Sequence, residues 1–266
     1  MESLPSQSPN AFGCPANSSQ LAWNAQLIGR LHSLPSSFES NLGQSDPTVH
    51  FLSRGPDYTV LFRDHEADFI LAKRKYASDT DSQSGARTAH QRTDAASIVD
   101  VLRMHLIGAS TGSGLSGQDR LPGIVNYFSG SDAALWHTGI PTFAKMQYCG
   151  VYPGIDLVYH GNPSRLEFDF QVAPGASASR IRLHFAGARR LELDGNGNLI
   201  VFARHGRIEF HKPLIYQLES DNSQRIVEGR FRVFTNGTLG FGSETTIIHG
   251  DWSSIRFLII QPIWEL

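Results

Sequence analysis

The chain has 266 residues, of which 40% are hydrophobic and 18% charged, so it is long and apolar enough to bury a sizeable core. This composition excludes a wholly disordered chain, and the formal net charge of −2 argues against a nucleic-acid partner. No apolar run approaches the roughly 18–20 residues that a membrane-spanning helix needs, so we predict no membrane span.

Residues 1–19 are rich in Ser, Pro and Asn, and we expect them to form a disordered leader. They lack the basic start and the apolar run of a secretory signal peptide. Residues 20–32 then place apolar side chains such as Leu21 and Ile28 at helical spacing, and Pro35 follows them. This pattern predicts a short N-terminal helix.

A meander of three strands is predicted next, over 49–54, 58–63 and 67–74, with a turn at Gly55-Pro56-Asp57 between the first two. Residues 78–97 are polar, and we interpret them as a surface loop inserted into the same domain. A fourth strand is predicted over 98–107, and the Gly/Ser-rich residues 108–117 are predicted to form a loop.

From Asn126 onward, strand patterns recur about every ten residues, separated by turn sequences such as Pro153-Gly154 and Asn236-Gly237. In the most regular pattern, Leu166 to Val172, apolar and polar residues alternate, which is typical of a half-buried strand. The expected strands are 143–148, 155–159, 166–172, 181–186, 190–193, 199–203, 208–210, 214–217, 225–234 and 238–241. We therefore predict an all-β fold, a single antiparallel β-sandwich-like module over residues 20–266.

Several stretches resemble a known bacterial module. They are FESNLGQ from Phe38, GIPT from Gly139 after Trp136, GVYPGIDL from Gly150, LEFDF from Leu166 and VAPGA from Val172. Over roughly 34–262, the chain resembles the β-rich module, a domain of unknown function, that precedes propeller-like repeats in SBBP-repeat cell-surface proteins. Such relatives run on into the repeats, so we expect residues 258–266 to be a truncated tail.

The resemblance implies a function without catalysis. It suggests a structural or adhesion module of an exported bacterial cell-surface protein, located outside the cell or at its surface although no signal peptide is visible. The partners that it implies are cell-surface polysaccharide or other domains of a larger exported protein. No enzyme activity and no cofactor are expected.

Two carboxylates, Glu167 and Asp169, are the first candidates for chemistry, because residues at i and i+2 of a strand project from one face. A glycoside hydrolase-like enzyme using such a pair is one alternative. Cross-strand ion pairs with Arg180 and Arg182 of the next predicted strand are the simpler interpretation.

Asp156 follows the Pro153-Gly154 turn, and we expect it either to fix that turn by accepting backbone hydrogen bonds or to contact a ligand. The Asp194-Gly195-Asn196-Gly197 run lacks the spacing and closing Glu of a calcium loop, and it predicts a hairpin turn instead. Cys149 is interpreted as a small buried hydrophobic residue. No metal site is predicted, because no motif with metal-ligand spacing occurs.

Aromatic residues between 127 and 159 are the best candidates for binding. Most should lie in the core of a sandwich. Trp136 could instead stack on a sugar ring, with Tyr127, Asp156 and Tyr159 as further ligand contacts. A carbohydrate-binding module is therefore the first alternative, ahead of the hydrolase, and we expect it to require that Trp136 be at least half exposed.

Overall fold

The structure is a computed structural model that describes residues 35–55, 58–73, 98–162, 165–219, 223–243, 252–260 and 263–265. The predicted leader, the N-terminal helix and the surface loop 78–97 lie outside these residues. The described residues form strands with two short 3₁₀ helices, which confirms the predicted all-β class. The two 3₁₀ helices are η1 (Ala133–Leu135) and η2 (Ala178–Arg180).

The first nine strands all belong to one large sheet. They are β1 (Phe38–Ser40), β2 (Phe51–Arg54), β3 (Tyr58–Phe62), β4 (Glu66–Lys73), β5 (Ile98–Leu106), β6 (Gly114–Tyr127), β7 (His137–Tyr152), β8 (Ile155–Asn162) and β9 (Arg165–Val172).

The later strands divide between this sheet and a second one. They are β10 (Leu183–Ala186), β11 (Arg190–Leu193), β12 (Leu199–Phe202), β13 (Arg207–Phe210), β14 (Leu214–Glu219), β15 (Gln224–Val233), β16 (Leu239–Ser243), β17 (Trp252–Ile260) and β18 (Ile263–Glu265).

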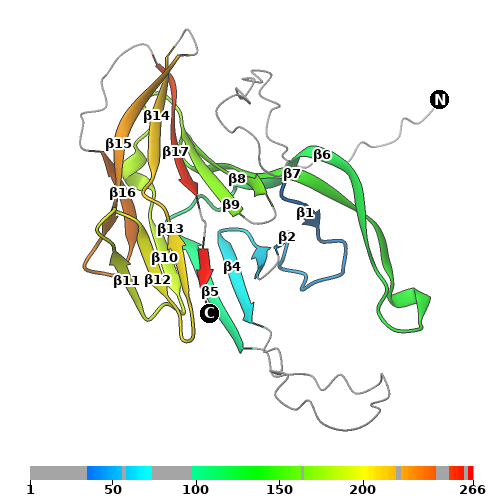
Figure 1. The fold of residues 1–266 in the computed structure, drawn as a ribbon. Helices are drawn as coiled ribbons and strands as arrows, with labels where there is room; N and C mark the ends of the chain where they lie inside the picture. The colour runs from blue at the N-terminus through cyan, green and yellow to red at the C-terminus, as the bar shows by residue number, and fades with distance from the viewer. Residues whose placement is uncertain are drawn as a thin grey trace, which may run out of the picture.

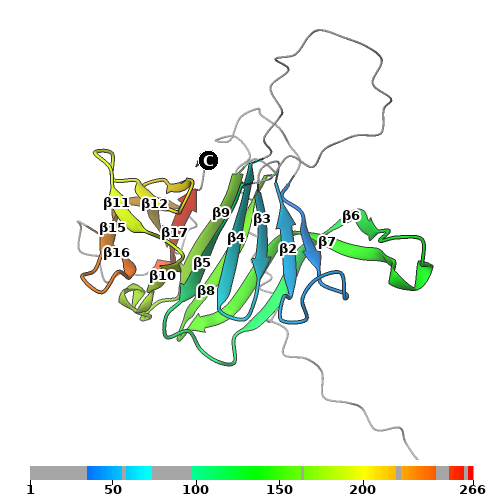
Figure 2. The same ribbon diagram turned by 90° about the horizontal axis from the view of Figure 1, so that it is seen from below.

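The large sheet has fourteen antiparallel strands in the order β1-β2-β3-β4-β5-β10-β16-β15-β14-β17-β9-β8-β7-β6. It folds over on itself, because β1 pairs with β7 as well as with β2. The smaller sheet has the order β11-β12-β13-β18. Figures 1 and 2 show the small sheet beside the folded large one.

The core lies between these layers, and its aromatic rings connect them. Phe62 of β3 contacts Tyr159 of β8 edge to face, with ring centroids 4.8 Å apart. Phe210 of the small sheet lies within 5.5–6.5 Å of Phe69, Phe168 and Phe185 of the large one. The alternating apolar residues of β9 all face this core, as their pattern predicts.

One long hairpin projects from the body, and its direction is clear in Figures 1 and 2. It consists of most of β6 and the first part of β7, from His137 to Pro141, which pairs only with β6 among the described strands. The second part of β7 returns to the body and pairs with β8. We call residues 120–141 the arm.

Candidate functional site

The tip of the arm carries an apolar cluster exposed to solvent. Phe128 is 63% exposed and Trp136 is 40% exposed, and their rings contact edge to face at 5.1 Å. Leu135 and Ile124 of the arm are also exposed. An exposed group of large apolar side chains is typical of an interaction surface.

Local sequence explains how this tip is built. Asp132 caps η1, because its side chain accepts a hydrogen bond of 2.9 Å from the backbone N–H of Ala134. The short helix then turns Trp136 back, so that its indole Nε1 donates to the carbonyl of Gly130 at 3.2 Å. This bond and the contact with Phe128 hold the indole in place. Trp136 does not reach the half exposure expected of a sugar-stacking platform.

Tyr127 fixes the arm to the body rather than presenting itself to a ligand. Its hydroxyl donates a hydrogen bond to the Glu39 carboxylate of β1 and accepts one of 3.1 Å from Arg54 Nε of β2. Burial is the main reason that the pKa of Tyr127 is raised, and the hydrogen bond to Glu39 adds to it. The phenol therefore stays neutral and continues to donate to the carboxylate.

Tyr159 is 1% exposed and belongs to the core, between Phe62 and Phe168. Burial raises its pKa far above the ordinary value. The predicted ligand contact at Tyr159 is therefore corrected, because its side chain faces inward like the other odd-numbered residues of β8.

Asp156 lies on the opposite face of β8 and is partly buried. Its carboxylate accepts hydrogen bonds from the backbone N–H of Gly150 at 2.7 Å and from Gln147 Nε2 at 3.1 Å. These contacts fix the bulged end of β7 where it turns into β8. Both oxygen atoms are thus used by the fold itself.

Glu167 and Asp169 do not form the expected ion pairs with Arg180 and Arg182. They instead flank His160 of β8, whose Nε2 lies 3.2 Å from Asp169 and whose Nδ1 lies 3.7 Å from Glu167. The register explains this, because His160 pairs directly with Glu167 and stands diagonally opposite Asp169. Asp169 is only 1% exposed and one of its oxygens, Oδ1, has no hydrogen-bond partner, so the face of β9 expected to be solvated is covered here.

In this cluster the two carboxylates and the imidazole shift one another's pKa values. Burial by itself lowers the pKa of His160, but the hydrogen bond and charge of Asp169, with the charge of Glu167, outweigh it and raise the pKa. Burial is the largest cause of the raised pKa of Glu167. Both carboxylates face one imidazole, whereas the two carboxylates of a glycosidase pair flank a bound sugar.

The interpretation of Cys149 as an inert buried thiol is wrong. Cys149 is disulfide-bonded and only partly buried. The sequence contains one other cysteine, Cys14, which lies outside the described residues. Two cysteines in a sequence do not by themselves indicate a disulfide.

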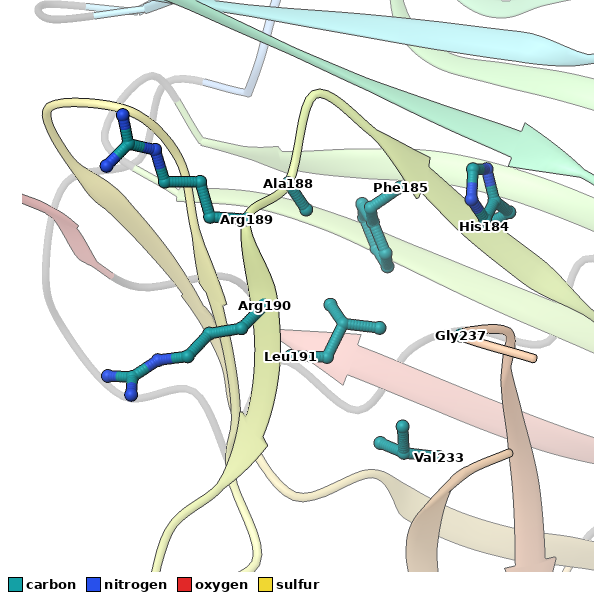
Figure 3. A pocket seen from close by; sticks show the side chains of 8 residues that line it. All are labelled: His184, Phe185, Ala188, Arg189, Arg190, Leu191, Val233 and Gly237. Atoms are coloured by element: carbon teal, nitrogen blue, oxygen red, sulfur yellow. The ribbon is translucent and has the colours of Figure 1, made fainter. Parts of the chain in front are cut away.

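A small hollow of about 240 Å³ lies between β10, β11 and the turn that joins β15 to β16. Figure 3 shows Phe185 and Leu191 pointing into it, whereas Arg189 and Arg190 extend away from it. Its lining includes His184 but no carboxylate, hydroxyl or thiol side chain. Within the described ranges, moreover, no three His, Cys, Asp or Glu side chains are grouped to hold a metal ion.

Comparison with known proteins identifies a family for this chain. No curated protein and no solved structure matches the chain. In the part of the chain that is described, no helix is long and apolar enough to cross a membrane. Residues 38–262 match a family described as a domain of unknown function, DUF7948. Since the match covers most of the sequence, the chain belongs to the DUF7948 family.

Proposed function

We propose that this chain is a non-catalytic structural or adhesion module of an exported bacterial cell-surface protein, and that it docks through the arm. The observation that carries the proposal is the apolar tip, formed by Phe128, Leu135 and Trp136 at the end of a hairpin that leaves the body. A soluble fold stabilises such a tip poorly, since its apolar side chains contact water instead of the core. Docking against another surface removes that cost.

Two further features support the proposal. The first is the disulfide at Cys149, because disulfides persist in oxidising compartments such as the cell exterior. The second concerns the polar side chains considered above as candidates for binding or chemistry. Those of Tyr127, Asp156 and His160 all contact other residues of the chain, which agrees with a structural role for them. The sequence resemblance to modules of exported bacterial proteins agrees with both.

The experiment compares binding of the purified chain to bacterial cells, by flow cytometry, before and after the tip is made polar. We expect Phe128→Ser combined with Leu135→Ser to lower cell-bound protein several-fold at unchanged thermal stability. Val99→Ser is the matched control, because Val99 is 49% exposed on β5, outside the arm. Equal binding by the arm variant and the control would contradict the proposed docking.

A further inference from the structure

A second surface lies on the outer faces of β15 and β16. In β16, Leu239 and Phe241 are buried and point into the core, whereas Gly240 and Gly242 alternate with them. The outward positions of this strand therefore carry no side chains. The register places Arg232 of β15 beside Gly240 and Arg230 beside Gly242.

Arginine side chains use the space that the glycines leave open. A Cβ atom at Gly240 would stand 2.9 Å from Arg182 Nη1 and 2.9 Å from a ring carbon of Phe234. A Cβ atom at Gly242 would stand 3.0 Å from Arg232 Cδ. The two glycines thus provide a flat floor on which these longer side chains lie.

Phe234 holds two of the guanidinium groups. The guanidinium carbon of Arg182 lies 4.4 Å from the centre of the Phe234 ring, and that of Arg232 lies 5.7 Å from it. Arg182 also donates from Nη1 to the carbonyl of Ile181 at 2.8 Å. These contacts reduce the freedom of the two guanidinium groups before any ligand arrives.

The charge of this pair is not neutralised. Among the described residues, no carboxylate forms an ion pair with Arg182 or Arg232, and their guanidinium groups make the contacts given above. Several other arginines do pair with acids: Arg103 contacts Asp68, and Arg190 contacts Glu192. Two preorganised guanidinium groups without acidic partners form a site for an oxyanion.

We propose that this arginine surface, Arg182 and Arg232 on the Gly240–Gly242 floor with Phe234 between them, binds an acidic polysaccharide through its carboxylate or sulfate groups. The overall charge of −2 disfavours a long nucleic acid. A lipid surface is disfavoured because Phe234, the apolar member of the site, is half-buried between arginines. The choice of polysaccharide over another anion rests on the proposed surface location, but the site does not use the arm.

The test measures binding of the purified full chain to polygalacturonate and to heparin by calorimetry at low ionic strength. Dextran is the neutral comparison. We expect both acidic polymers to bind, dextran not to bind, and salt to weaken the binding. Arg182→Gln combined with Arg232→Gln should weaken it by about 10- to 100-fold, since charge-assisted hydrogen bonds are lost.

Two variants make the test specific to this site. Arg190→Gln removes one positive charge that already pairs with Glu192, so binding should be unchanged. Gly240→Ala keeps every charge but displaces Arg182 and Phe234, so binding should weaken while the melting temperature stays near that of the parent. Melting curves of all variants report whether each one folds.

Three results would overturn the proposal. The first is that neither acidic polymer binds. The second is that Arg190→Gln weakens binding as much as the double arginine variant does. The third is that polyglutamate or anionic phospholipid vesicles bind as tightly as the polysaccharides. Binding that survives Phe128→Ser and Leu135→Ser but not the arginine changes would support this site even if docking by the arm fails.

Discussion

The hydroxyl of Tyr127 joins two segments that are 88 residues apart, since it donates to Glu39 at the base of the arm. Removing it with Tyr127→Phe should lower the free energy of unfolding by about 1–2 kcal/mol, because the buried carboxylate loses a hydrogen bond. Urea denaturation measures this difference. Phe128→Leu, at an exposed neighbouring position, should change stability by less than about 0.5 kcal/mol. Similar losses in the two variants would contradict this role.

His160 predicts a dependence of stability on pH. Its pKa is raised above 6.5 in the folded state, so its stabilising interaction is fully present below pH 6.5 and is lost as the pH rises through the folded pKa. The pKa of Glu167 is raised above its ordinary 4.5, so this carboxyl also favours the folded state less as the pH rises, starting from about pH 4.5. We therefore expect the protein to become less stable as the pH rises from 6 toward 8.

His160→Gln should flatten this dependence, and chemical denaturation at several pH values measures it. The variant removes the titrating imidazole while keeping a side chain that can hydrogen-bond to Asp169. Asp169→Asn should cost more stability at pH 6 than at pH 8, because protonated His160 gains more from the carboxylate than the neutral imidazole does. A parent stability that does not fall between pH 6 and pH 8 would contradict the assignment.

The contacts of Glu167 and Asp169 with His160 could not be predicted from the sequence, although the two carboxylates could be selected as candidates for chemistry. The alternation of β9 correctly places Glu167 and Asp169 on one face. Which basic side chain they contact depends on the register between β8 and β9, and that register places His160, not an arginine, beside them. The inward position of Tyr159, in contrast, follows from the alternation of β8, and only its aromatic type suggested a ligand contact.

Most strands of the body were predicted within a few residues, because half-buried strands alternate in polarity and end at Gly, Pro or Asn turns. Strands β1, β17 and β18 were not predicted, and residues 258–266 were expected to be a truncated tail. Strand β6 was missed as well, and residues 108–117, where it begins, were expected to form a loop. The reason is physical: the arm has little contact with the core, so β6 has no buried face and no alternation. It also contains Pro122, and a proline usually argues against a strand. The pairing of β6 with β7 is correspondingly irregular, with two register shifts.

The close approach of β8 and β9 leaves no room for a side chain at Gly161. Its φ is +125°, and a Cβ atom there would stand 2.2 Å from the carbonyl oxygen of Arg165. Gly150 has a φ of +59° but open space around it. Gly150→Ala should cost about 1–2 kcal/mol from backbone strain, and Gly161→Ala should cost about 1–3 kcal/mol more from crowding. Thermal or urea unfolding compares the two, and equal losses would contradict the close approach.

The disulfide at Cys149 affects the stability of the whole molecule. Dithiothreitol should lower the free energy of unfolding by about 2–5 kcal/mol, and Cys149→Ser should reproduce the loss. The variant itself should not respond to dithiothreitol, which separates the disulfide from other effects of the reagent. A melting temperature unchanged by reduction would contradict a structural disulfide.

The all-β sandwich-like architecture was predictable for the molecule as a whole, because regularly spaced short strands leave few other arrangements. The strand order was not. Contacts such as that of Asp100 with His205, 105 residues apart, join the sheets across the fold and leave no local pattern. The arginine surface likewise forms only because the fold places Arg182 beside Phe234 and Gly240, which lie far from it in the sequence.

The position of β17 also constrains how the protein is made. This strand, residues 252–260, lies between β9 and β14, so it joins two parts of the large sheet that were synthesised much earlier. Until it emerges from the ribosome, the edges of β9 and β14 stay open to other chains. Folding to the complete sheet therefore waits for nearly all of these 266 residues and should be slow. For a chain that crosses a membrane before folding, such a delay is an advantage, because an unfinished sheet keeps the polypeptide competent for translocation.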